Sequence, residues 1–236
     1  MNFNIPYRSP NIRYGFKVKT DQFGNKVSSY FHDEHEIVAI KNFEKYMLEM
    51  VKKDPNRTYT MIELGSNQAY YSLMFHSILK KFGATPRNIL IEALEENLNR
   101  GVNEFLTNNF EAESRLYSVG TLEKVIEALK TISDEAAKKC LTFNPNWRTL
   151  SEIFEEFKLE SLDVLQCDID CSESVLFETS EEIFRNKKIN YIFLSTHLHF
   201  HEISLKFLKE CGYKILLNND SSFPPVGFDT FIIAKA

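Results

Sequence analysis

Cysteine, glycine and proline are scarce in this sequence of 236 residues, with 4, 8 and 7 copies respectively. The four cysteines form no C-x-x-C pair, so we expect free thiols in a reducing compartment. With so little glycine and proline, and with 43% hydrophobic residues, nothing in the composition suggests disorder. The length fits one α/β domain with an N-terminal extension.

The sequence also lacks an excess of basic residues and any long apolar run. Its 28 Lys and Arg against 33 Asp and Glu give a formal net charge of -5, which argues against nucleic acid as the main partner but leaves room for a local basic patch. No run approaches the roughly eighteen apolar residues that a membrane span needs. The first residues contain no apolar core of signal-peptide length. We therefore expect a cytoplasmic protein with neither a nucleic-acid nor a membrane partner.

The order of hydrophobic patterns predicts a Rossmann-like α/β fold. Residues 1–57 form the expected N-terminal extension, with a helix over about 33–53, and residues 58–236 form the main domain. Strand patterns occur at residues 58–64, 88–93, 115–119, 162–169, 190–196, 213–219 and 228–236. Helical periodicity separates all of them except the last two. This predicts a doubly wound, seven-stranded, mostly parallel sheet with helices on both faces and an antiparallel C-terminal strand.

Ligands of such sheets bind beyond the carboxyl ends of the strands, so the residues after each strand are the candidate site. After the first strand, Gly65 allows a sharp turn and a close approach of a ligand to the backbone. Ser66 and Asn67 follow at the start of a helix, whose free N–H groups can face a polar ligand. Glu63 can offset the positive charge of a sulfonium or amino group. An ordinary strand-to-helix turn is the alternative interpretation.

The second and third strands end in further candidates. Glu92 and Ala93 end the second strand, and the Glu92 carboxylate is placed to accept hydrogen bonds from two ribose hydroxyls. Ser118 and Val119 end the third strand at the same edge of the sheet. Together with Gly65, Glu92 predicts a nucleoside cofactor.

A dinucleotide such as NAD is the competing cofactor. Its pyrophosphate normally requires a G-x-G-x-x-G turn. Here only Gly65 is present, and Asn67 and Ala69 stand where further glycines would be. S-adenosylmethionine (SAM) carries no pyrophosphate and fits the acidic strand ends better.

The chain also resembles the FkbM-type methyltransferases, a branch of the class I SAM-dependent fold, from about Tyr59 to Lys235. The most distinctive segments are IELGSNQAYYSLMF (62–75), ILIEALEENLNRGVNEF (89–105) and RTLSEIFEEFKLESLDVLQCDIDCSESVL (148–176). INYIFLSTH, LKECGYKI and FDTFIIAKA resemble the closing segments of the family.

The resemblance implies SAM as cofactor, with Glu63, Gly65, Asn67 and Glu92 lining its site. It also implies methylation of a hydroxyl, often on a sugar or another secondary metabolite. The chain departs from the family pattern at Ala69, Gln166, Asp168, Asp170, Cys171 and Ser195. These departures concern the acceptor and the catalytic base more than the cofactor.

Three residues are candidates for catalysis. Methyl transfer requires alignment of donor and acceptor, and a hydroxyl acceptor must also lose a proton to a base. Asp168, at the end of the fourth strand, is the first candidate. Asp170 is the second, although it could cap the next helix instead. His197 is the third, since an imidazole titrates near neutral pH and the family also has His there.

Three alternatives remain open at this point. His197, His199 and His201 together with the nearby carboxylates could hold a divalent metal, but their spacing matches no strong metal motif and none is predicted. The chain could also bind SAM or a nucleoside without catalysis, as a regulatory or assembly module. Less favoured is a nicotinamide-dependent oxidoreductase.

The aromatic residues near these segments support two further hypotheses. Tyr70 and Tyr71 could flank the ligand because they follow the glycine turn. Tyr30, Phe31, His32 and His35 could form part of a lid over the site, or could pack against the domain or a second copy in a homodimer.

Overall fold

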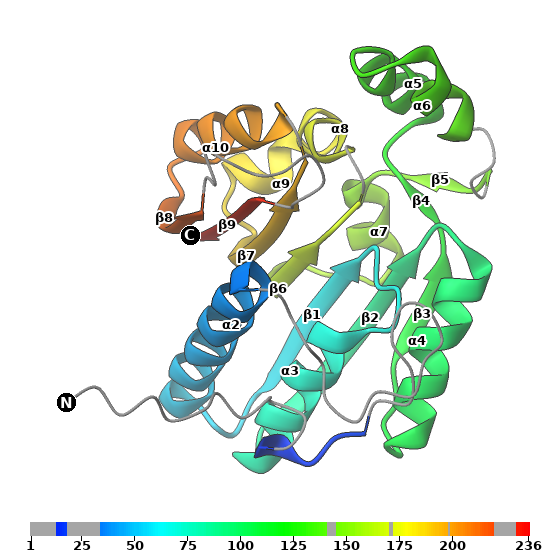
Figure 1. Ribbon diagram of the computed structural model, residues 1–236. Helices are drawn as coiled ribbons and strands as arrows, with labels where there is room; N and C mark the ends of the chain where they lie inside the picture. The colour runs from blue at the N-terminus through cyan, green and yellow to red at the C-terminus, as the bar shows by residue number, and fades with distance from the viewer. Residues whose placement is uncertain (1–12, 18–33, 141–144, 170–171, 198, 220–229) are drawn as a thin grey trace.

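The computed structural model describes residues 13–17, 34–140, 145–169, 172–197, 199–219 and 230–236. Their main feature is a seven-stranded sheet with helices on both faces, which confirms the predicted Rossmann-like fold (Figure 1). The strands are β1 (Thr58–Leu64), β2 (Thr85–Glu92), β3 (Glu113–Leu116), β6 (Leu162–Cys167), β7 (Ile189–Thr196), β8 (Lys214–Asn219) and β9 (Thr230–Lys235). Their order in the sheet is β3-β2-β1-β6-β7-β9-β8.

The pairing of the strands fixes where a ligand can bind. All neighbouring pairs among the first five strands are parallel, and β9 runs antiparallel to both β7 and β8. The prediction of an antiparallel C-terminal strand is therefore confirmed. The strand order reverses between β1 and β6, so the carboxyl ends of these two strands flank the crevice that such sheets use for binding.

Alternating side chains bury the sheet on both faces. Along β1, Met61 packs into one core and Ile62 into the other. The first core is covered by α2 (Glu34–Lys53), α3 (Tyr70–Lys81) and α4 (Glu95–Thr107). The second is covered by α7 (Leu150–Glu156), α8 (Glu173–Thr179), α9 (Glu181–Arg185) and α10 (Phe200–Glu210). Since α2 contributes buried residues to the first core, the helix of the predicted N-terminal extension packs directly on the sheet.

The third predicted strand, 115–119, is wrong as one continuous element. After β3 the chain leaves the main sheet, and β4 (Ser118–Val119) pairs in parallel with β5 (Trp147–Arg148) in a separate small sheet. The N–H of Tyr117 donates to the carbonyl of Glu92, so the chain is still anchored at the end of β2. Pairing with a segment so distant in sequence gives no local signal.

Between β4 and β5 lies a helical insertion above the strand ends (Figure 1). It contains α5 (Leu122–Lys130) and α6 (Asp134–Cys140). Val125 and Leu129 form its small core together with Val175 of α8. The insertion is therefore attached to the main domain through α8.

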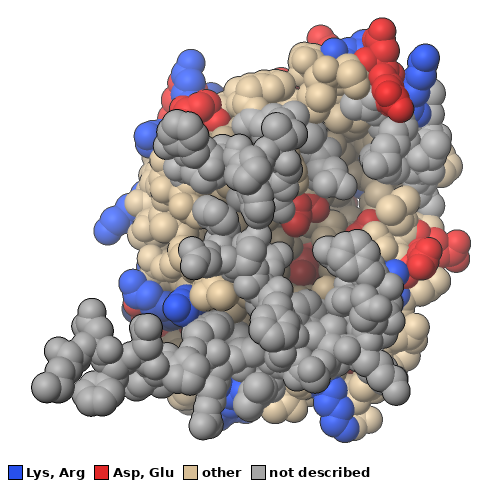
Figure 2. Space-filling view, viewed as in Figure 1, with Lys and Arg blue, Asp and Glu red and all other residues tan. Residues whose placement is uncertain are grey.

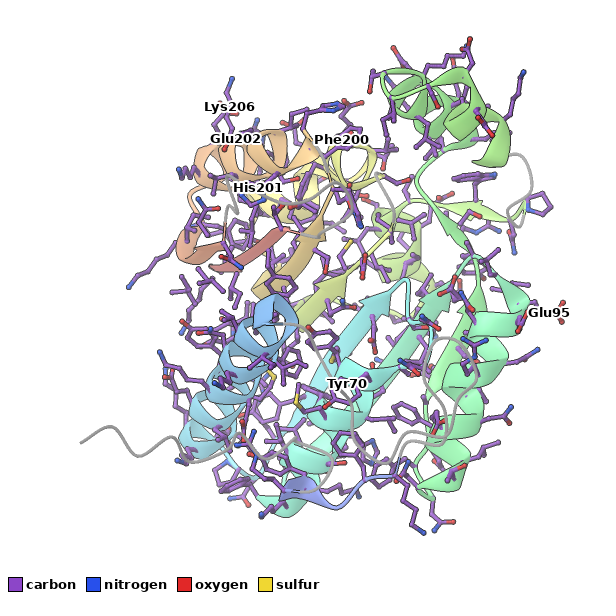
Figure 3. All side chains as sticks on the ribbon, viewed as in Figure 1. Tyr70, Glu95, Phe200, His201, Glu202 and Lys206 are labelled. Atoms are coloured by element: carbon purple, nitrogen blue, oxygen red, sulfur yellow. The ribbon has the colours of Figure 1, made fainter. Side chains whose placement is uncertain are left out.

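Helix α10 shows how amphipathic patterning places its residues. Figure 3 shows His201 on the side of α10 that faces the sheet, with Glu202 and Lys206 on the outer side. Gly212 follows this helix with φ 75°, the left-handed conformation in which a glycine often ends a helix. Within the described ranges, no helix has the length and apolar character that crossing a bilayer would require.

Some predictions fall on other segments. Tyr30, Phe31 and His32, the core of the predicted lid, lie outside the described residues, and only the backbone of His35 is described, in α2. Asp170 and Cys171 also lie outside the described residues.

Candidate functional site

A cavity of about 380 Å³ lies at the carboxyl ends of the strands. Eight of the residues singled out from the sequence line it: Gly65, Asn67, Glu92, Ala93, Ser118, Val119, Asp168 and His197. The remaining lining residues are Leu94, Asn97, Tyr117, Trp147, Ile169 and Ser172. The fold thus brings together residues that follow β1, β2, β6 and β7 and residues of the small sheet formed by β4 and β5. Glu63 and Ser66 do not line this cavity.

The loop after β1 approaches its neighbours too closely for any side chain at Gly65. A Cβ there would lie 1.7 Å from the carbonyl oxygen of Asp168, and the φ of Gly65 is +71°. The N–H groups of Gly65 and Ser66 both donate to the carbonyl of Ile91, at 2.9 and 3.1 Å. Gly65 therefore holds the ends of β1, β2 and β6 together at the cavity wall.

Two further residues of this loop have left-handed backbones. Asn67 has φ 42° and Ala69 has φ 56°, a region that glycine adopts most easily. This geometry gives a physical reason for the glycine that the family has at the position of Ala69. Across the loop, a Cβ on Gly101 of α4 would lie only 2.7 Å from the carbonyl oxygen of Asn67. The loop is thus packed against α4 as well.

Glu92 connects the loop after β1 with the end of β2. Its Oε2 accepts a hydrogen bond from the N–H of Asn67 at 2.9 Å, and its Oε1 accepts from the N–H groups of Ala93 and Leu94 at 2.8 and 3.0 Å. The side chain is largely buried, with 7% of its surface exposed. These backbone donors fix the carboxylate at the wall of the cavity, where a ligand hydroxyl could reach it.

Glu63 lies behind the loop. It is 3% exposed, and its Oε2 accepts a hydrogen bond from the N–H of Ser72 at 2.9 Å. Burial raises the pKa of Glu63 to about 8, although the hydrogen bonds from Ser72 oppose this shift. The side chain can therefore be neutral near neutral pH, which the sequence did not indicate.

On the other side of the cavity, His197 lies between two carboxylates. Its Nδ1 is 2.7 Å from Oε1 of Glu173, and its Nε2 is 3.7 Å from Oδ1 of Asp168. Asp168 is 39% exposed at its side chain, whereas Glu173 is completely buried. Asp168 and His197 were both predicted as site residues, and the structure brings them together.

Glu173 was missed as a site residue. Glu173 lies within the segment 148–176 that resembles the family, but a glutamate at the start of a helix is common and does not by itself indicate a site residue. Glu173 does begin α8, and its carboxylate points to His197 instead of solvent.

An aromatic wall also went unpredicted. Tyr117 and Trp147 line the cavity from the segments around the small sheet. The Tyr117 hydroxyl donates to Oε2 of Glu156 at 2.9 Å, and burial together with this carboxylate raises the Tyr117 pKa. Tyr70 and Tyr71, which the sequence suggested as ligand neighbours, do not line the cavity. Tyr70 packs against Phe16, and Tyr71 packs against Phe43.

The three histidines considered for a metal site are dispersed. His201 is buried in α10, with Nδ1 close to the hydroxyls of Thr196 and Thr230 and Nε2 2.7 Å from Oδ1 of Asn218. His199 lies against Thr131. Among the residues that the structure describes, no group of three or more His, Cys, Asp or Glu side chains could hold a metal ion.

The surroundings of the cavity are acidic. Figure 2 shows Asp and Glu side chains inside a hollow near the centre of this face, whereas most of the Lys and Arg side chains visible there lie toward its edge. Glu92 and Asp168 both contribute carboxylates to the cavity wall. Such a site favours a ligand with positive charge and disfavours a pyrophosphate.

The doubly wound sheet, its glycine turn and the carboxylate at the end of β2 define a class of protein, the Rossmann-like proteins that bind a nucleoside cofactor. A family model described as the methyltransferase FkbM domain matches residues 63–215, which is more than half of the chain. The chain belongs to the FkbM methyltransferase family, and its cofactor is SAM. No curated protein matches the chain significantly.

Solved structures with the same fold include three methyltransferase domains. The METTL16 MTase domain has a TM-score of 0.56 and 11% identity, covering 96% of this chain and 75% of that chain. The N-terminal domain of human METTL16 in complex with SAH has a TM-score of 0.53 and 11% identity, covering 96% and 77%. The human methyltransferase 10 domain containing protein has a TM-score of 0.50 and 9% identity, covering 96% and 91%. At these identities the likeness concerns the fold alone.

The cavity suits SAM on two grounds. Its volume of about 380 Å³ lies within the range of ligand pockets. The carboxylates of Glu92 and Asp168 in its wall complement the positive charge of the sulfonium.

Proposed function

We propose that this protein transfers the methyl group of SAM to a hydroxyl of a small molecule such as a carbohydrate or a secondary metabolite. One observation carries the proposal. The pair Asp168 and His197 faces the same cavity as Gly65 and Glu92. A group that can take a proton therefore lies beside the residues expected to hold the cofactor.

The cofactor would be held mainly by the ends of β1 and β2. Glu92 would bind the ribose hydroxyls, and Gly65 and Asn67, which line the cavity, would lie with their backbone against the ligand. Ser66, also predicted for the cofactor site, would support this loop through the hydrogen bond of its N–H to the carbonyl of Ile91. Ala93, Ser118 and Val119 would line the base, and Asp168 would lie on the side of the methyl group. Glu63 would support the loop from behind by its contact with Ser72. When bound, SAM supplies a methyl group on a positively charged sulfur, and this sulfur is the leaving group that keeps the electron pair of the carbon–sulfur bond.

A hydroxyl acceptor must lose its proton, and few described groups at the cavity can receive it. Burial, reinforced by nearby carboxylates, holds the pKa of the Cys167 thiol well above its usual value. The Tyr117 hydroxyl already donates to Glu156. Glu92 is engaged by three backbone N–H groups. Asp168 and His197 remain as the groups that would bind and accept the proton, with Asp170 as a further candidate.

For the domain organisation, we propose residues 58–236 as the methyltransferase domain. Residues 1–57 would form an extension whose helix α2 covers the sheet. Two roles of this extension, a lid over the site and a homodimer contact, stay hypotheses. Acceptor kinetics of a shortened chain would test the lid, and the protein's mass in solution would test the homodimer.

The test begins with calorimetric titration of the purified, cofactor-stripped protein with SAM, SAH and NAD. We expect micromolar binding of the first two and none of NAD. Transfer of a tritiated methyl group from SAM to a panel of hydroxylated small molecules then tests catalysis. Binding without transfer to any acceptor would favour a regulatory module, and no SAM binding by the folded protein would refute the proposal.

Two matched variants connect the chemistry to the cavity. Asp168→Asn and His197→Gln should lower the transfer rate by a factor of about one hundred or more, the usual contribution of general base catalysis. His199→Gln is the control, because His199 lies outside the cavity. Equal loss in all three variants would contradict the assignment.

A further inference from the structure

The buried carboxylate of Glu173 is the feature that the proposed function leaves unused. Glu173 is 0% exposed, and its Oε1 lies 2.7 Å from Nδ1 of His197. Among the described residues, its Oε2 is buried without a hydrogen-bond partner. A buried carboxylate is costly unless it is paired, so the contact with His197 is the one that compensates for its burial.

We infer that Glu173 is a positioning residue, which orients His197 so that its Nε2 receives the proton of the acceptor hydroxyl. This inference rests on the proposed function, since it assigns the base of the same reaction. It adds a residue that does not line the cavity and acts only through His197.

The hydrogen-bond geometry selects one tautomer of the imidazole. A carboxylate only accepts hydrogen bonds, so Nδ1 of His197 must carry the proton in the contact with Glu173. Nε2 then keeps its lone pair and lies on the side of Asp168, which lines the cavity. An imidazole in the opposite tautomer would have no basic nitrogen on that side.

The proposed step would break and form equal numbers of bonds. The acceptor O–H bond would break and its proton would pass to Nε2 of His197. The electron pair left on oxygen would form the bond to the methyl carbon, while the bond between this carbon and the sulfur of SAM would break and its electron pair would stay on sulfur. The resulting imidazolium lies between Glu173 at 2.7 Å and Asp168 at 3.7 Å. Opposite charges at these distances stabilise the protonated ring, which aids the step that forms it.

Within the described part of the chain, two carboxylates face His197. Glu173 approaches from α8, and Asp168 follows β6. Cys167 lies below them as a buried thiol, and burial, together with Glu173 and Asp168, raises its pKa. Because the thiol stays neutral, the two carboxylates set the charge around the ring among the described residues.

The first experiment observes the imidazole itself and needs no acceptor. The full-length protein is labelled with ¹⁵N in its six histidines, and the signals of His197 are assigned by their loss in His197→Gln. We expect the tautomer with the proton on Nδ1 at neutral pH. A proton on Nε2 of the neutral ring would overturn the inference, whatever the catalytic activity of the protein.

The second experiment measures Glu173→Gln, with Glu178→Gln as control. Glu178 lies on the same helix but is exposed, with a side chain that is 58% accessible. For Glu173→Gln we expect kcat to fall about tenfold or more, KM and SAM affinity to stay within about twofold, and the pH profile of kcat to shift. Glu178→Gln should leave all four unchanged.

A double-mutant cycle separates positioning from general support of the fold. In the His197→Gln background, Glu173→Gln should have no further effect on kcat, because its partner is gone. An equal loss in both backgrounds would overturn the inference. If wild type transfers methyl groups to no acceptor, the proposed function fails, while the tautomer measurement still decides the relationship between Glu173 and His197.

Discussion

Oε2 of Glu92 accepts a hydrogen bond from the N–H of Asn67 at 2.9 Å, and this contact joins the loop after β1 to the end of β2. The same carboxylate receives the N–H groups of Ala93 and Leu94. Glu92 is thus positioned from two sides at the wall of the cavity. A ligand hydroxyl that binds there meets a carboxylate that does not need to be reorganised.

From this geometry we expect Glu92→Ala to weaken SAM binding at least about tenfold, or roughly 1.4 kcal/mol. The substitution removes both the acceptor for the ribose and the anchor of the Asn67 N–H. Glu95→Ala is the control, because Glu95 points away from the domain at the start of α4 (Figure 3). Calorimetric titration measures both affinities. An unchanged affinity for Glu92→Ala would exclude Glu92 from the cofactor site.

Gly101 offers a test of the same loop from outside the cavity. In Gly101→Ala the new Cβ would lie 2.7 Å from the carbonyl oxygen of Asn67, so the loop must shift. We expect SAM affinity to fall about fivefold, or roughly 1 kcal/mol. The free energy of unfolding should change little, because the higher helix propensity of alanine, about 1 kcal/mol above that of glycine, offsets the strain from this contact. Asn99→Ala, an exposed position on the same helix, should change neither quantity. A normal affinity in Gly101→Ala would show that Asn67 plays no part in binding.

The strands of the main sheet were predictable because most are buried on both faces. β1, β6 and β7 form runs of apolar residues whose ends agree closely with the prediction. The small sheet was not predictable, because β4 and β5 have two residues each and pair across the whole insertion. Such pairing depends on tertiary contacts and leaves no periodicity in the sequence.

The same distinction applies to the site. Gly65, Glu92 and Asp168 were predictable, because the carboxyl ends of parallel strands converge at one edge of the sheet. Trp147 lies in β5 of the small sheet and Glu173 at the start of α8, and the positions of both relative to the strand ends are set by packing. Glu63 was predictable as a residue near the site, but its burial behind the loop follows only from the position of α3.

Glu63 should make the protein less stable as pH rises. The pKa of Glu63 in the folded protein is raised to about 8 from an ordinary value of 4.5, mainly by burial. The folded state therefore holds a proton that the unfolded state releases between these values. The contribution of Glu63 to the free energy of unfolding is complete below pH 4.5, and it falls by about 1.4 kcal/mol per pH unit up to pH 8.

Glu63→Gln should remove this dependence. Glutamine keeps an oxygen that can accept the N–H of Ser72 but cannot ionise. Urea unfolding at several pH values should show the variant to be more stable than wild type at pH 8 and similar to it at pH 4.5. Glu111→Gln, at an exposed position, is the control. If Glu63→Gln instead abolished SAM binding with stability unchanged, the carboxylate would act on the ligand as a charge.

His76 should have the opposite effect. It is a buried residue of α3 whose ring stacks on Phe110, with ring centroids 4.0 Å apart, and its Nδ1 is 3.0 Å from Oδ1 of Asn88. The Asn88 amide group donates to the carbonyl of Ser72, which leaves its oxygen to accept from Nδ1–H of His76. Burial lowers the pKa of His76 from 6.5 to about 4, with a further decrease from Lys80. The ring is therefore neutral in the folded protein at neutral pH.

Below pH 6.5 the unfolded chain binds a proton at this histidine, whereas the folded protein binds one only at about pH 4. The contribution of His76 to the free energy of unfolding is therefore complete above pH 6.5 and is lost as the pH falls. Between pH 4.5 and 6.5 its slope has the opposite sign to that of Glu63, so wild type alone would show little of either effect. His76→Gln separates them. For each protein, the loss is the decrease in the free energy of unfolding between pH 6.5 and pH 4. This loss should be smaller in the variant than in wild type by on the order of 3 kcal/mol. Parallel curves for the two proteins would mean that His76 ionises in the folded state as easily as in the unfolded chain, and that its burial against Phe110 does not exclude the charged ring.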